Sequence, residues 1–136
     1  MAKNKRTEEQ ISRKAEQHNK SDSSQWESEE IFQIIFENSS IAIAIMEVDT
    51  TISMVNNAFC ELSGYSKEEI IGTSWTKLIS PDDLERIKEY NRRRLINPAD
   101  APNKYEFRFM AKDGAIRYGL LSVSLIRSGK KIITSY

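Results

Sequence analysis

The segment 54–83, MVNNAFCELSGYSKEEIIGTSWTKLISPDD, contains three helix-start signals. Asn56 can cap the residues that follow it, and Ser66 with Glu69 has the spacing of a capping box. Ser80 precedes a proline and two aspartates, which favours another helix start. Helices this short are rarely stable alone. The segment therefore predicts a series of short helices packed on a flat surface of the same domain.

Runs of residues typical of β-strands flank this segment, with two before it and three after it. They cover residues 41–48, 51–55, 105–111, 116–126 and 131–136. The sequence Lys112-Asp113-Gly114 separates two of these runs and predicts a tight hairpin turn, since glycine tolerates a positive φ. Strands on both sides of a helical segment predict an α+β domain.

Four motifs carry a resemblance to a known family: VNNAF, GYSKEEIIG, SW followed by LI and PDD, and KDG. Their order and spacing resemble those of PAS domains from bacterial or archaeal signalling proteins, over about residues 29–136. The resemblance implies a PAS fold, which is a five-stranded antiparallel sheet with short helices on one face and an N-terminal flanking helix. It also implies a sensory or interaction module.

The chain is expected to divide into three parts. Residues 1–23 are polar and predict a mobile segment, residues 24–38 a flanking helix, and residues 39–136 the PAS domain. The apolar stripe of the flanking helix is wider than one packed face requires. It is interpreted either as a surface docked on the sheet or as a homodimer contact, with four candidate interface residues: Trp26, Ile31, Phe32 and Ile35.

Composition excludes several classes of partner. Lys and Arg total 20 and Asp and Glu total 20, so no net charge favours nucleic acid or an anionic membrane. No apolar run is long enough to span a bilayer, and the N-terminus lacks a signal-peptide core. The single cysteine, Cys60, cannot form an internal disulfide. These features predict a cytoplasmic protein without a membrane segment.

Catalysis and metal binding are not expected. The only histidine, His18, lies in the polar N-terminal segment, so neither a catalytic triad nor a structural zinc site can be assembled from the core. Three arginines, 92–94, are expected to oppose the negative end of the helix dipole. The sequence therefore predicts a non-enzymatic domain without a metal.

The cofactor-bearing branches of the resembling family are poorly matched. Haem-binding members use a histidine on the long helix, and residues 82–97 contain none. Photoactive flavin members use a cysteine just after the glycine that corresponds to Gly72, whereas Cys60 lies earlier. Haem and covalent flavin are therefore not expected, and the cofactor is undetermined.

A ligand, if one binds, is expected between the sheet and the helices. The candidate lining residues are Ile45, Phe59, Trp75, Leu78, Ile87, Tyr105, Phe107 and Leu121. The alternative is that these side chains fill the core at normal density. Flavin-carrying PAS domains also pair a glutamate before the glycine with a lysine of the hairpin turn, which implies an ion pair between Glu69 and Lys112.

The expected function is a PAS sensory module that binds a small ligand, dimerises, or does both to regulate an output domain outside this chain. The resemblance implies a sensor histidine kinase of a two-component phosphorelay as the parent. The alternatives are a cyclic-dinucleotide signalling enzyme as the parent, or an interaction module that dimerises without a ligand.

Overall fold

The computed structural model describes residues 23–135. The predicted mobile segment 1–23 lies outside them except for Ser23. The chain divides into two compact units between residues 36 and 37, and each is described by itself. A helix occupies residues 23–38. Residues 37–135 form the unit that contains the sheet.

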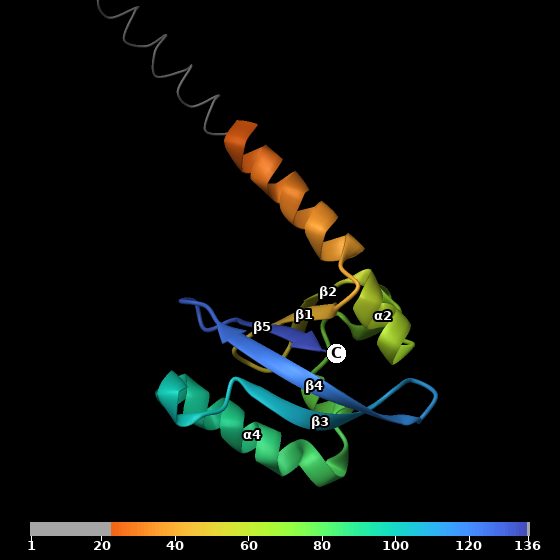
Figure 1. Ribbon diagram of the computed structural model, residues 1–136, viewed down its shortest axis with the longest axis vertical. Helices are drawn as coiled ribbons and strands as arrows, with labels where there is room; N and C mark the ends of the chain where they lie inside the picture. Colours follow the sequence, from red (N-terminus) through yellow and green to blue (C-terminus); the bar gives the residue numbers. More distant parts are fainter. Residues whose placement is uncertain (1–22, 136) are drawn as a thin grey trace, which may run out of the picture. The chain divides into compact units, whose positions relative to one another are not determined.

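Five strands form one antiparallel sheet in the order β2-β1-β5-β4-β3 (Figure 1). Their bounds are β1 (Ala42–Met46), β2 (Ile52–Val55), β3 (Lys104–Met110), β4 (Ile116–Leu125) and β5 (Lys131–Ser135). The last strand therefore lies in the middle of the sheet, between the first and the fourth. This architecture confirms the predicted α+β fold.

The helical segment lies between β2 and β3. It comprises α2 (Asn57–Ser63), α3 (Lys67–Ile70), the 3-10 helix η1 (Trp75–Leu78), α4 (Pro81–Ile96) and the 3-10 helix η2 (Pro98–Asp100). Two predicted start signals are confirmed: Oδ1 of Asn56 accepts from the backbone N–H of Phe59, and Ser66 with Glu69 forms a reciprocal capping box. Gly64 follows α2 with φ of 79°, a left-handed conformation that ends the helix.

The third start signal is confirmed as a helix start, since α4 begins at Pro81 with two aspartates in its first turn, but Ser80 does not cap it with its side chain. The Ser80 side chain makes no capping hydrogen bond, and only its carbonyl oxygen accepts from the backbone N–H of Asp83, at 2.9 Å. The backbone N–H of Ser80 donates to the carbonyl oxygen of Arg108, also at 2.9 Å. Ser80 is 1% exposed because this bond joins the start of α4 to β3.

The core lies between the helices and one face of the sheet. On β1 the buried residues are Ala42, Ala44 and Met46, and the intervening isoleucines are only half-buried. Successive side chains of a strand point to opposite faces, so Ile45 lies on the face away from this core. The prediction that Ile45 faces the ligand region is wrong. The small alanines allow α2 to lie close to the sheet, which favours them over isoleucine on this face.

Candidate ligand-binding site

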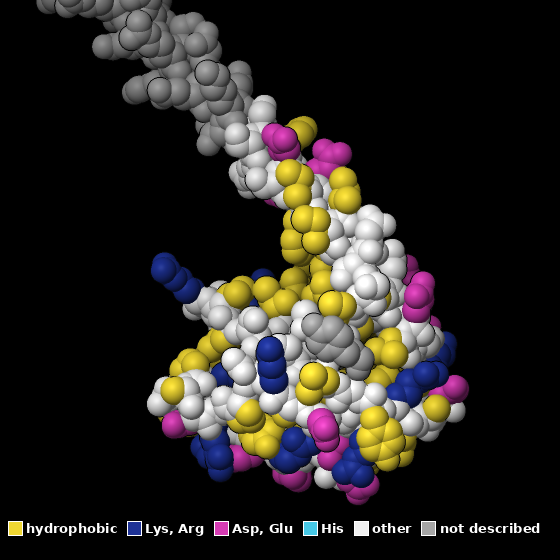
Figure 2. Space-filling model, viewed as in Figure 1, with side chains coloured by type: hydrophobic (Ala, Val, Ile, Leu, Met, Phe, Trp, Pro, Cys, Tyr) yellow, Lys and Arg dark blue, Asp and Glu magenta, His cyan; other side chains and the backbone are white. Residues whose placement is uncertain are grey.

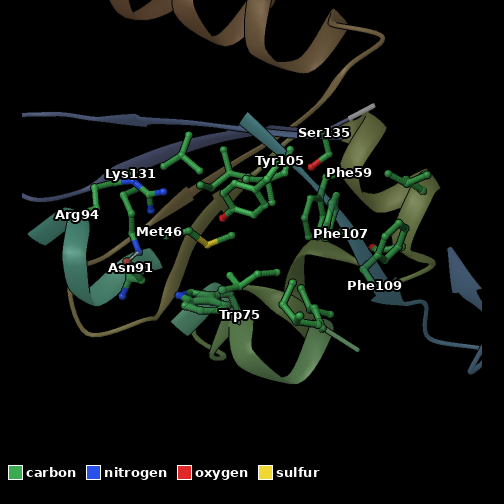
Figure 3. A pocket seen from close by; sticks show the side chains of 18 residues that line it. Met46, Phe59, Trp75, Asn91, Arg94, Tyr105, Phe107, Phe109, Lys131 and Ser135 are labelled. Carbon is green, nitrogen blue, oxygen red and sulfur yellow. Dashed lines mark hydrogen bonds between the residues drawn. The ribbon is translucent and has the colours of Figure 1, made fainter. Parts of the chain in front are cut away.

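A cavity of about 70 Å³ lies inside the core, between the sheet and the helices (Figure 3). Its lining includes seven of the eight residues proposed from the sequence: Phe59, Trp75, Leu78, Ile87, Tyr105, Phe107 and Leu121. The eighth, Ile45, does not line it, and Met46 occupies the inward position of β1 instead. Most of the lining is apolar, as in small-molecule sites generally.

Aromatic side chains form one end of this cavity. Phe107 and Phe109 alternate with outward residues on β3, and their ring centroids lie 5.7 Å apart. Phe59 of α2 lies near them in Figure 3. This end offers no charged side chain, so it suits the apolar part of a ligand.

The opposite end is polar, which was not predicted from the sequence. Figure 3 shows Asn91, Arg94 and Lys131 grouped there. Asn91 and Arg94 follow Ile87 on α4 at intervals of four and three residues, which places all three on one side of the helix. Lys131 begins β5 and pairs in register with Met46 of β1. The helical spacing of Asn91 and Arg94 could have predicted from the sequence that they share a face. The position of Lys131 could not be predicted, because it depends on the order of the strands in the sheet.

Both cations are deeply buried. Lys131 is 3% exposed and Arg94 is 4% exposed. Burial, followed by repulsion from Arg94, lowers the pKa of the Lys131 ammonium to about 8. Within residues 23–135, no Asp or Glu forms an ion pair with either side chain. Two buried cations therefore share this site without an acidic partner among the described residues.

The local hydrogen bonds only partly satisfy this cluster. Nζ of Lys131 donates to Oδ1 of Asn91, and Nη2 of Arg94 donates to the carbonyl oxygen of Pro102 at 2.7 Å. Nζ of Lys131 also lies 5.5 Å from the centroid of the Trp75 ring. Nε1 of Trp75 is buried and has no hydrogen-bond partner among the described residues. Buried donors without a partner are uncommon, so the indole N–H is available to an acceptor.

The predicted arginine cluster separates into two groups. Arg92 and Arg93 are exposed and both bond to the carboxylate of Glu89, at 2.6 and 3.0 Å. Arg94 is turned inward and lines the cavity. Arg93 and Arg94 are basic residues of the last helical turn, as predicted, but Arg94 turns inward because helical periodicity gives it a different face.

A second charged site lies at the start of α4. The Asp83 carboxylate accepts from the backbone N–H, Nε and Nη2 of Arg108, at 2.7, 3.0 and 2.7 Å. These hydrogen bonds, with Arg108 as the main cause, lower the pKa of Asp83 to about 2. Asp83 is thus more than a favourable charge at a helix N-terminus, because it ties α4 to β3.

The structure also brings together Glu69 and Lys112, which lie 43 positions apart in the chain. Nζ of Lys112 lies 2.6 Å from Oε2 of Glu69, while Oε1 of Glu69 accepts from the backbone N–H of Ser66 at 3.2 Å. The two carboxylate oxygens divide the two roles. The bond to Lys112 is the main cause of a lowered pKa for Glu69.

The candidate interface residues are on the helix 23–38. Trp26, Ile31, Phe32 and Ile35 are exposed, and Trp26 reaches 75%. Figure 2 shows hydrophobic side chains running along this helix. The homodimer stays a prediction.

These features define a class, an α+β domain with an internal cavity. Comparison with known families gives its name: the model of the PAS fold matches residues 52–134, which is more than half of the chain. The chain belongs to the PAS family. PAS domains are sensory modules of signalling proteins and not enzymes, so the chain is a sensory module.

The similar proteins include two signalling proteins and one solved PAS domain. The chain is 32% identical to the probable diguanylate cyclase DgcE of Escherichia coli over 74% of its length, and 26% identical to the sensor histidine kinase TmoS of Ectopseudomonas mendocina over 73%. It spans only 9% and 10% of those two proteins. The solved domain is the PAS domain of the quorum-sensing receptor RpfR of Cronobacter turicensis in complex with C12:0. Its TM-score is 0.62 at 17% identity, with 72% of this chain and 93% of that chain covered.

Within residues 23–135, no helix has the length and apolarity needed to cross a membrane. The same residues hold no group of three or more His, Cys, Asp or Glu side chains arranged to bind a metal ion. Cys60 is half-buried against the core, and burial raises the pKa of its thiol.

Proposed function

We propose that this PAS domain senses a small molecule bound in the cavity between its sheet and its helices. The observation that carries the proposal is the polar end of the cavity, where Arg94, Lys131 and Trp75 present donors to an enclosed space. A core that only needed to pack would be filled by apolar side chains at lower cost. The RpfR PAS domain, which shares the fold, was solved in complex with C12:0, and this supports the binding of a small molecule by a domain of this fold.

The output domain is proposed to lie elsewhere in the parent protein. The resemblance to TmoS supports a sensor histidine kinase of a two-component phosphorelay, and the resemblance to DgcE supports a diguanylate cyclase. In either parent, ligand binding would shift the population of two arrangements of the domain. A cytoplasmic location is proposed with either output.

A homodimer is the second part of the proposal. The helix 23–38 exposes Ile31 and Phe32, at 49% and 44%, and the sheet exposes Tyr118 and Leu120 on its outer face, at 79% and 43%. Apolar side chains exposed in such numbers are typical of interaction surfaces. Each surface alone would support contact with a second copy of the chain.

One competing function is supported by a specific observation. A cavity of about 70 Å³ is small for a ligand site, since such sites are typically roughly 300 Å³ or larger. A dimerisation module without a ligand would fit a cavity of this size. It predicts that no small molecule stabilises the domain.

Native mass spectrometry, an absorbance spectrum and thermal unfolding with a metabolite panel test the ligand proposal on the 136-residue chain. An additional bound mass, a chromophore band or a concentration-dependent rise in melting temperature supports ligand sensing. A dimer without bound mass, unresponsive to the whole panel, supports the dimerisation module instead.

The dimer is tested by Ile31→Glu, with Gln33→Glu as the matched control on the same helix. Sedimentation velocity at about 50 µM, an ordinary concentration for a transient interface, should show a dimer for the wild type and the control and a monomer for Ile31→Glu. A monomeric wild type would contradict the dimer.

A further inference from the structure

We infer that the cavity recognises a compact organic anion of the short-chain carboxylate class, with its carboxylate at Lys131, Arg94 and Trp75 and its alkyl part toward Phe107. The inference rests on the proposed ligand-sensing function and specifies the chemistry of the ligand. It is carried by the charges, the donors and the size of the cavity, each of which excludes a different class of molecule.

The charge of the site points to an anion. Arg94 and Lys131 line the cavity, and none of its other lining residues is acidic. The hydrogen bonds to Asn91 and Pro102 go to neutral oxygens, which do not compensate for two positive charges. A buried cation without a counterion is unfavourable, and an incoming anion removes that penalty for both side chains at once.

The hydrogen-bonding groups point the same way. The Lys131 ammonium, the Arg94 guanidinium and the Trp75 indole N–H can all donate. Nε1 of Trp75 has no acceptor within the described residues. In Figure 3 this nitrogen lies at the end of the ring that is turned toward Asn91 and Lys131. A carboxylate accepts several hydrogen bonds with its two oxygens, whereas an ammonium ligand would place donors against donors and an alcohol would bring no negative charge.

The size of the cavity limits which anions fit. A volume of about 70 Å³ is room for roughly five water-sized groups. This is sufficient for a carboxylate and a few methylene groups and insufficient for a long acyl chain. An inorganic anion such as phosphate would leave the aromatic end in contact with water, at Phe59, Phe107 and Phe109. A short alkyl carboxylate matches both ends.

The test compares matched probes on the full 136-residue chain by isothermal titration calorimetry at constant ionic strength. Sodium butyrate should bind, and butyramide, which has nearly the same shape without the charge, should bind at least about tenfold more weakly. Sodium phosphate and sodium dodecanoate test the inorganic and the long-chain alternatives. Butyrate should also shift the indole N–H resonance of Trp75, which is identified with the variant Trp26→Phe.

Two variants of adjacent lysines locate the anion. Lys131→Met removes the buried charge and keeps an unbranched apolar chain. It should weaken the binding of butyrate at least about tenfold and abolish the shift that butyrate causes in the Trp75 indole N–H resonance. Lys130→Met is the matched control, because Lys130 is 45% exposed and pairs with Glu47 at 3.4 Å. It should leave butyrate affinity unchanged.

The outcomes separate the inference from the function on which it rests. If butyramide binds as well as butyrate, or if phosphate or dodecanoate binds more tightly, the short-carboxylate inference is overturned while ligand sensing stands. If butyrate binding survives Lys131→Met or the Trp75 resonance does not move, the placement of the anion is overturned. If neither these probes nor a metabolite panel binds, both the inference and the ligand-sensing function fail.

Discussion

The two ends of α4 bury charge in opposite ways. At its start, Asp83 is 5% exposed and accepts three hydrogen bonds from Arg108 of β3. Near its end, Arg94 is 4% exposed and lies beside Lys131 of β5 with no carboxylate partner among the described residues. The charge of Asp83 is neutralised within the described residues, whereas the proposed ligand would neutralise the second site.

Under the ligand proposal, this difference is one between a structural and a functional use of buried charge. A buried ion pair holds two elements together, and the loss of one partner is strongly destabilising. Two like charges buried together oppose folding and persist only where something else requires them. Substitutions at the two sites should therefore change stability in opposite directions.

The largest effect is expected at the start of α4. Asp83→Asn removes the charge that three donors of Arg108 face, and it should lower the free energy of unfolding by about 2 kcal/mol. Urea denaturation followed by circular dichroism measures this. Asp82→Asn is the matched control, since the Asp82 side chain is 74% exposed. This variant should lower the free energy of unfolding by less than about 0.5 kcal/mol. Equal effects from the two variants would mean that Asp83 does not bridge α4 and β3.

The opposite sign is expected at Lys131. Lys131→Met should raise the free energy of unfolding of the unliganded domain by about 1–2 kcal/mol at pH 7, because a buried charge is replaced by an apolar side chain. Lys130→Met should change it by less than about 0.5 kcal/mol. A clear loss of stability in Lys131→Met would show that the lysine is a structural element like Asp83, and the contrast between the two ends would disappear.

The pH dependence of stability sharpens the same contrast. The pKa of Lys131 is lowered to about 8 in the folded state from 10.5, so its unfavourable contribution is present in full below pH 8 and is relieved as the pH rises toward 10.5. Arg94 faces the same cavity, and so does Tyr105, whose pKa is raised by burial. The stability difference between wild type and Lys131→Met should therefore narrow between pH 7 and 9.5. A constant difference would mean that Lys131 titrates normally.

Acid acts on the other end of α4. The pKa of Asp83 is lowered to about 2 from 3.8, so its stabilising contribution is present above pH 3.8 and is lost as the pH falls toward 2. The free energy of unfolding of the wild type should thus fall toward that of Asp83→Asn as the pH falls from 5 to 2. If the urea midpoints of the two proteins run parallel over this range, the carboxylate is not stabilised by Arg108.

The smallest effect is expected for Glu69 and Lys112, whose side chains are 41% and 52% exposed. An exposed pair is screened by solvent, so a double-mutant cycle of Glu69→Ala and Lys112→Ala should give a coupling well below the effect of Asp83→Asn. Additive single effects would show that the two side chains do not interact in solution. A coupling as large as the Asp83 effect would contradict the distinction between exposed and buried charge.

Much of the fold could be predicted from interactions between residues that are close in the sequence. Asn56 and the pair of Ser66 with Glu69 act through backbone groups a few residues away, so their roles follow from spacing alone. Alternation on β3 likewise placed Tyr105, Phe107 and Phe109 on one face. The choice of face on β1 failed for Ile45, because alternation gives two faces and only the helix above the sheet decides which one is buried.

The sequence by itself determined the order of elements, the helix starts and most of the apolar wall of the cavity, since these depend on contacts within a few residues or on periodicity. Only the tertiary structure decided that Lys131 meets Arg94 and Trp75. Those residues come from β5, α4 and η1, up to 56 positions apart, and they meet because the last strand enters the middle of the sheet. A charge that looks solvated in the sequence is buried here because packing between distant elements sets its environment.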